Sequence, residues 1–271
     1  MFLRRLLFIS CTLILLSSCS SEFQKAVNST DFEYKYNVAN KLYDAGSYET
    51  AKVLYDEVRG HYRSSVEFQD ILFKYAKCNF EMGDYVFASH YFNQFATTYT
   101  TNSQREEAAF LSAYSDYSMS GSYRLDQEST TAAIEKFQEY INTFSNSPRI
   151  GEANKLMDEM RGKLEIKDFE SANLYFKTSD YVAAMHSFDN FVRKFPDSEY
   201  VELARFNLAK ANYQLASQSL ISKQKERFES TINNCKYFIR KFPDSDYAKE
   251  ATAMIETATN KLKLLKENDR Y

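Results

Sequence analysis

Histidines, cysteines and clustered carboxylates are the side chains that could give this 271-residue chain catalytic or metal-binding chemistry. The three histidines are His61, His90 and His186, and no two of them have the i, i+4 spacing that places two metal ligands on one helix face. The sequence contains no glycine-rich phosphate loop and no Gly-x-Ser-x-Gly nucleophile motif. These observations predict a protein that is not an enzyme and that uses no metal ion or cofactor.

The four cysteines do not form the pattern of a disulfide framework. Cys11 and Cys19 lie close to the N-terminus, whereas Cys78 and Cys235 lie far apart within amphipathic helical patterns. A cysteine in such a pattern usually behaves as a small buried hydrophobic residue. We therefore expect Cys78 and Cys235 to be core residues without a bridge between them.

The N-terminal segment has the features of an export signal. Arg4 and Arg5 precede an apolar run, residues 6–16, that is shorter than the roughly 20 residues a membrane-spanning helix needs. The run ends in Leu16-Ser17-Ser18-Cys19, which resembles the lipobox of bacterial lipoproteins. The resemblance implies removal of residues 1–18 and lipid attachment to Cys19, with an ordinary signal peptide as the alternative.

The lipidated leader is expected to comprise residues 19–30. Two or more acyl chains anchor a protein stably to a membrane, whereas a single chain does not. The residue after the cysteine is Ser20 and not the aspartate that some bacteria use to retain lipoproteins in the inner membrane. By resemblance, this favours the outer membrane.

Composition favours a helical protein that does not bind nucleic acid. Without residues 1–18 the chain has 32 basic and 37 acidic residues, so it lacks the strong positive charge of most nucleic-acid-binding proteins. Six glycines and three prolines are too few for the many turns of an all-β fold.

Helices of two kinds alternate along the chain in an internal repeat. Eight small, aromatic or turn residues recur at a constant offset of 37 residues, and several of them are spaced as on one helix face. The two sets are Ala39, Tyr43, Gly46, Tyr48, Ala51, Tyr55, Val58 and Tyr62, and then Ala76, Phe80, Gly83, Tyr85, Ala88, Phe92, Phe95 and Tyr99.

Further copies of the pattern predict five second helices, which end near Tyr62, Tyr99, Phe144, Phe195 and Phe242. The pattern resembles the tetratricopeptide repeat, which implies an all-α solenoid of about five helix pairs. Three segments, 118–128, 149–168 and 217–227, exceed the usual spacing. We interpret the first and last as longer turns or helix extensions, and 149–168 as an added amphipathic helical stretch. We expect N-terminal repeats over 31–126, and C-terminal repeats with a capping helix over 127–271.

Helix starts are marked by potential capping boxes, in which Ser or Thr is followed three residues later by Glu. These are Thr30 with Glu33, Ser64 with Glu67, and Ser103 with Glu106.

The first helices of the first two pairs carry the candidate binding site. Their alignment predicts a peptide-binding groove, because aromatic residues supply much of the energy at recognition sites. The alternative is that half of these side chains are buried between helices. The predicted groove residues are Tyr36, Asn40, Tyr43, Phe73, Lys77 and Phe80.

A resemblance to one lipoprotein family extends over essentially the whole chain after the signal. Residues 160–164 (Met-Arg-Gly-Lys-Leu), 172–176 (Ala-Asn-Leu-Tyr-Phe) and 195–198 (Phe-Pro-Asp-Ser) resemble the BamD family of β-barrel assembly factors. The resemblance implies a protein anchored to the periplasmic face of the outer membrane. Its implied partners are a BamA-like barrel insertase, other members of the assembly complex and unfolded outer-membrane proteins.

Two other classes of envelope protein remain as alternatives to this resemblance. One is a periplasmic tetratricopeptide scaffold that coordinates peptidoglycan synthesis or another envelope complex. The other is a sugar-binding outer-membrane lipoprotein, although such proteins usually carry long insertions that this chain lacks.

Overall fold

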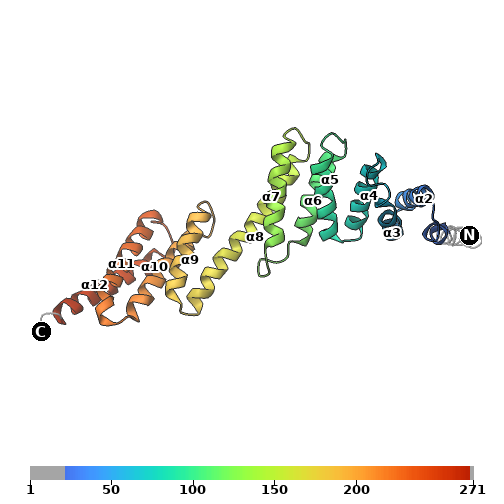
Figure 1. Cartoon of the computed structure of the whole chain (residues 1–271). Coiled ribbons are helices and arrows are strands. Elements are labelled where there is room, and N and C mark those ends of the chain that lie inside the picture. The colour runs from blue at the N-terminus through green and yellow to red at the C-terminus, as the bar shows by residue number, and fades with distance from the viewer. Residues whose placement is uncertain (1–21, 269–271) are drawn as a thin grey trace, which may run out of the picture. The chain divides into compact units, whose positions relative to one another are not determined.

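The computed structural model describes residues 22–268, and all regular secondary structure in that range is helical. A short helix over 22–27 comes first (Figure 1). The helices that follow are α2 (Phe32–Asp44), α3 (Tyr48–Arg59), α4 (Glu67–Glu81), α5 (Tyr85–Thr98), α6 (Arg105–Met119), α7 (Glu128–Thr143), α8 (Ile150–Lys177), α9 (Tyr181–Lys194), α10 (Val201–Ser217), α11 (Ile221–Lys241) and α12 (Ala248–Asn268).

The helices form five antiparallel pairs of the tetratricopeptide type, α2–α3 through α10–α11, followed by α12. Each predicted second helix is confirmed, and its observed end lies within three residues of the predicted one. No helix within the described range is both long enough and apolar enough to cross a bilayer. The signal segment 1–18 and Cys19 lie outside the described residues, so the structure does not test the predicted lipidation.

The chain divides into two compact units, one ending at Met160 and the other beginning at Arg161. Ala133 and Phe137 of α7 pack with Phe110 of α6, and Met157 of α8 belongs to the same cluster, so the third pair and the start of α8 lie in the first unit. The grouping of repeats over 31–126 and 127–271 stays an expectation. The stretch 149–168 was predicted to be helical, and residues 150–168 do lie in helix α8.

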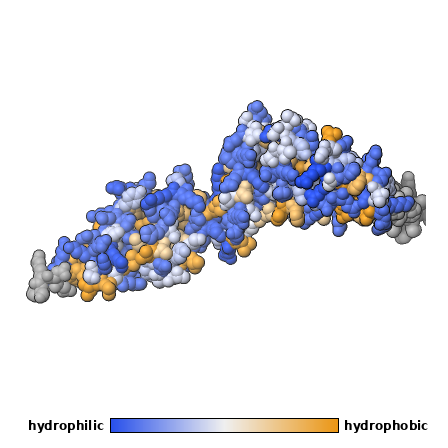
Figure 2. All heavy atoms as spheres, in the orientation of Figure 1, coloured by the Kyte–Doolittle hydropathy of each residue, from blue (hydrophilic) through white to orange (hydrophobic). Residues whose placement is uncertain are grey.

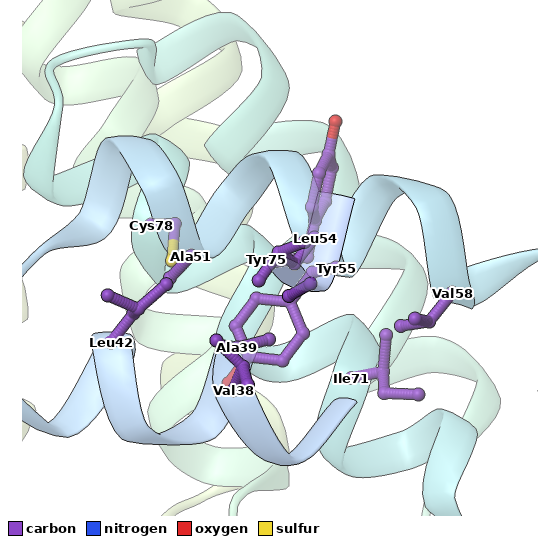
Figure 3. Close-up of a cluster of buried hydrophobic side chains, with 11 residues drawn as sticks. Val38, Ala39, Leu42, Ala51, Leu54, Tyr55, Val58, Ile71, Tyr75 and Cys78 are labelled. Carbon is purple, nitrogen blue, oxygen red and sulfur yellow. The ribbon is translucent and has the colours of Figure 1, made fainter. Parts of the chain in front are cut away.

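The repeated small and aromatic residues form the core of each pair. In the first pair, Ala39 and Ala51 are fully buried where α2 and α3 cross, and Tyr55 and Val58 fill the space beyond them (Figure 3). Ile71 of α4 closes this cluster. A small residue at the crossing lets two helices approach closely, and the large residues then fill the remaining volume at the density of a protein interior.

The turns within the pairs use a left-handed backbone conformation. Gly46 and Gly83 have φ of 75° and 78°, and Ser179 occupies the same position in the fourth pair with φ of 64°. Glycine adopts this conformation without steric cost, whereas serine does so only with strain. Gly46 and Gly83, which recur in the 37-residue repeat, each lie between the two helices of their pair.

The predicted capping boxes do not match the observed helix starts. The α2 cap is Asp31 and not Thr30: its Oδ1 accepts from the backbone N–H groups of Glu33 and Tyr34, at 3.0 and 3.1 Å. Helices α4 and α6 begin at Glu67 and Arg105, so Ser64 and Ser103 do not cap them. A three-residue spacing fits several registers, and the packing of the helix selects one of them.

Serines fix the turns between pairs. Ser147 Oγ accepts from the Arg149 N–H at 3.0 Å and donates to Glu106 Oε1 at 2.6 Å. Ser245 repeats this arrangement with Tyr247 and Glu202. Each serine thus caps the start of the following helix and links the turn to the first helix of the preceding pair.

Candidate functional site

The predicted groove residues lie on the first helices of the first two pairs, and we call this surface the first-helix face. Tyr36, Asn40 and Tyr43 project from α2, and Lys77 and Phe80 project from α4. All five are half-buried, so each side chain contacts the fold and also reaches solvent. They are spaced three or four residues apart on their helix, which places them along one side of it.

A polar network joins α2 to α4 across this face. Tyr36 donates its hydroxyl to Asp70 Oδ2 at 2.6 Å, and Asp70 pairs with Lys74 at 2.9 Å. Lys74 Nζ in turn donates to Asn40 Oδ1 at 2.8 Å, and the Tyr55 hydroxyl donates to the same oxygen at 2.8 Å. The network therefore fixes the orientation of Tyr36 and Asn40 before any partner binds.

Burial controls the protonation of the tyrosines on this face. Desolvation, together with the hydrogen bond to Asp70, raises the pKa of Tyr36 to about 12. Desolvation also raises the pKa of Tyr43, whose ring packs edge-on against Tyr48 and Tyr55. Both phenols remain protonated at neutral pH and offer uncharged aromatic rings, with the Tyr36 O–H group donated to Asp70.

The second half of the face combines a cation with aromatic rings. Lys77 Nζ lies 3.3 Å from Glu81 Oε1 and 4.0 Å from Glu107 Oε1 of α6. The same ammonium group lies 5.4 Å from the centroid of the Phe80 ring. The Phe80 ring contacts Tyr114 of α6 at a centroid distance of 6.0 Å, which extends the face onto the third pair.

Phe73 was predicted to line the groove, but it is buried. Its side chain is only 4% exposed and lies in the core of the second pair, with its ring centroid 5.7 Å from that of Phe92 and 5.3 Å from that of Phe95. Phe73 is four residues from Lys77 and seven from Phe80, yet it lies on the inward edge of the helix. It therefore supports the face from behind and cannot contact a partner directly.

Asp70 and Lys74 are the residues of this face that sequence reasoning missed. They are oppositely charged and four residues apart, a spacing that brings two side chains together on a helix. Lys77 and Glu81 form a second such pair, with the charges in reverse order, two turns further along α4. This charge pattern was a usable signal. The bond from Asp70 to Tyr36, however, depends on how two helix pairs stack.

One of the two cysteines among the described residues lies beneath this face. Cys78, which lies under it, and Cys235 are both buried and free. Desolvation raises the pKa of Cys78 to about 12 and that of Cys235 to about 11, so both are protonated thiols at neutral pH. Between residues 22 and 268, no three His, Cys, Asp or Glu side chains are grouped closely enough to hold a metal ion.

The helix pairs, their left-handed turns and the mixed aromatic and charged face define a helical-repeat protein of the tetratricopeptide type. A family described as "YfiO: Outer membrane lipoprotein" matches residues 29–227, with a second, overlapping match over 186–265. The first match alone covers well over half of the sequence. The chain therefore belongs to this family of outer membrane lipoproteins.

One curated relative is the "Outer membrane protein assembly factor BamD" of Pasteurella multocida (strain Pm70). It is 25% identical over 207 residues, which cover 73% of this chain and 79% of the relative.

Solved structures similar to the chain include a TPR repeats protein from Bacteroides fragilis NCTC 9343, with 14% identity, coverage of 86% of this chain and 99% of that one, and a TM-score of 0.38. Another is a tetratricopeptide repeat protein from Parabacteroides merdae ATCC 43184, with 13% identity, coverage of 97% and 98%, and a TM-score of 0.39.

Proposed function

We propose that this protein is a non-enzymatic assembly factor for β-barrel proteins of the outer membrane. The observation that carries the proposal is the family match over residues 29–227, supported by similarity to an assembly factor over 73% of the chain. In this proposal a lipid on Cys19 anchors the chain at the periplasmic face of the outer membrane. The repeats bind a BamA-type insertase, other members of the complex and unfolded outer-membrane proteins.

The first-helix face is the proposed site for an unfolded chain. A peptide has unpaired backbone carbonyl groups and apolar side chains, which the face can meet with donors and rings. Lys77 supplies a cationic donor beside the Phe80 ring, and Tyr36 and Tyr43 supply uncharged aromatic rings. Asn40 is held in position by Tyr55 and Lys74, so ordering it on binding costs little.

Depletion of the protein, followed by proteomics of purified outer membranes, tests the cellular role. We expect barrel proteins to fall together while lipoproteins without a barrel remain. Affinity purification of the lipidated chain should recover a BamA-type insertase. Normal barrel levels with a peptidoglycan synthase as the recovered partner would contradict the proposal and favour a scaffold for cell-wall synthesis.

A photocrosslinking amino acid tests the binding face separately. Position 77 on α4 lies on the face, whereas His90, exposed on α5 of the same pair, provides a matched control away from it. An unfolded barrel protein should crosslink several-fold more strongly from position 77. Equal yields from both positions would remove the face as the substrate site without affecting the assembly role.

Replacement of Cys19 tests the anchor. Cys19→Ala should release the chain from the membrane fraction. Retention of the variant at the membrane would show that a protein partner, and not lipid, holds it there.

A further inference from the structure

In the unit that ends at Met160, the turns within the three helix pairs lie along one edge, which we call the turn edge. It comprises residues 45–47, 82–84 and 120–127 between the paired helices. Lys52, near the start of α3, bonds Asp84 Oδ2 at 2.6 Å and lies 5.7 Å from the centroid of the Phe87 ring. The first two turns are therefore neighbours. Figure 1 shows the α4–α5 and α6–α7 turns together at the lower side of this unit.

Exposed hydrophobic residues gather at the turn edge. Val86 is 67% exposed and Phe87 is 54% exposed in the first turn of α5, close to Met82 at the end of α4. Leu125 in the α6–α7 loop is 62% exposed. In Figure 2, hydrophobic residues lie along the lower side of this unit, while its upper side is mostly hydrophilic.

The opposite edge of the same unit has a different composition. Its turns between pairs comprise residues 60–66, 99–104 and 144–149, in which Val66 is the one large hydrophobic residue with high exposure. Phe32, at the start of α2, is 36% exposed, and its ring is stacked on His61 at 4.2 Å. A cluster of apolar residues confined to one edge indicates an interaction surface.

The chain enters this unit at the turn edge. The helix over 22–27 runs antiparallel to α2, since Glu22 pairs with Lys41 in the last turn of α2 and Val27 O accepts from Lys35 Nζ near its first turn. Glu22 is therefore beside the end of α2, next to the first turn of the edge. Cys19 precedes Glu22 by three residues, and three residues span at most about 10 Å.

Charge at this edge does not attract an anionic surface. Asp84 and Glu22 are paired with Lys52 and Lys41, and the exposed carboxylates of Asp44 and Glu49 leave a negative balance. A lipid surface that lies against this edge must therefore be electrically neutral at the point of contact. The interface of a bilayer of zwitterionic lipid meets this requirement, because apolar side chains enter it without any charge attraction.

We propose that the turn edge lies against the lipid bilayer that holds the anchor, with Val86 and Phe87 inserted into its interface. The proposal rests on lipidation of Cys19, which is part of the proposed function. Two observations meet here independently: the apolar residues and the entry point of the chain are on the same edge. The edge then orients the first three helix pairs relative to the membrane.

The absence of tryptophan from the sequence allows a direct test. Phe87→Trp places the only tryptophan of the variant on the turn edge, and Val66→Trp, at a site that is 74% exposed, places a matched tryptophan on the opposite edge. Each full-length lipidated chain is reconstituted into phosphatidylcholine vesicles whose acyl chains carry bromine, a short-range quencher. Flotation of the vesicles measures anchoring in the same samples.

If the turn edge lies in the bilayer interface, the tryptophan fluorescence of Phe87→Trp should be quenched several-fold more than that of Val66→Trp. Its emission should also be shifted to the blue. This difference should persist at about 1 M salt, where the Debye length is only about 3 Å, because insertion is apolar. Anchored chains that show no quenching at either site would overturn the proposal and assign the edge to a protein partner. Equal quenching at both sites would also overturn it, since the unit would have no fixed orientation. Chains that fail to float would refute the lipid anchor itself and, with it, the membrane contact.

Discussion

Replacement of Gly83 by alanine tests the repeat at its turn. Gly83 has φ of 78°, and a Cβ atom added there meets no other atom within 4 Å. The cost is therefore purely one of backbone conformation. A left-handed non-glycine residue costs about 1–2 kcal/mol, and alanine recovers about 0.4–1 kcal/mol by restricting the unfolded chain. We expect a net loss of about 1 kcal/mol.

Two further substitutions make this prediction sharper, because the same physics gives them the opposite sign. Ser179→Gly relieves a strained φ of 64° at the equivalent turn, so it should raise stability by a few tenths of a kcal/mol to about 1 kcal/mol. Gly162→Ala lies inside α8 with open space around it and should stabilise by about 0.5–1 kcal/mol.

Thermal unfolding followed by circular dichroism measures all three variants. A change of 1 kcal/mol shifts Tm by about 2–4 °C in a domain of 150–250 residues. The reasoning is refuted if Gly83→Ala raises Tm as Gly162→Ala does, because the turn could not then be left-handed in solution. An unchanged Tm for Ser179→Gly would show that the serine carries no strain.

Three other predictions concern buried polar groups. Lys136→Met leaves the carboxylate of Asp116, which is 5% exposed and 2.7 Å from Lys136 Nζ, without its partner and should cost about 3 kcal/mol; adding Asp116→Asn should restore most of the loss in urea unfolding. The phenol of Tyr36, whose pKa burial raises to about 12, binds a proton in the folded state that the unfolded state has lost at pH 10–12. Stability should therefore fall with rising pH in this window, less steeply in Tyr36→Phe; an identical slope would contradict the assignment. Cys78 and Cys235 should react with a thiol reagent only after denaturant is added, and rapid labelling of the native chain would show that one is accessible.

Some features of the fold were predictable because they depend on neighbours within one helix or one turn. Ala39 and Ala51 are buried and Gly46 has a positive φ, as the 37-residue pattern predicts. The period of a helix decides which side chains share a face, and the absence of a Cβ decides which residue tolerates the turn. These rules need no knowledge of the rest of the chain.

The site was predictable only in part. Tyr36 and Lys77 were expected on one face and do lie on it, but Phe73 was assigned to the same face and is buried. Its position on the helix is at the boundary between face and core. A rotation of the helix by a fraction of a turn decides on which side of the boundary a residue falls, and that rotation is set by the packing of α4 against α5 through Phe92 and Phe95.

The sequence by itself determined the helices, their pairing and the repeated small and aromatic residues of their cores, because each follows from spacing along a short stretch of chain. Only the tertiary structure decided that Tyr36 bonds Asp70 and that Glu22 meets Lys41. It also decided that the apolar residues near Phe87 share an edge with the point where the chain enters. These contacts join residues 19 to 35 positions apart, and their geometry depends on how separate helices stack.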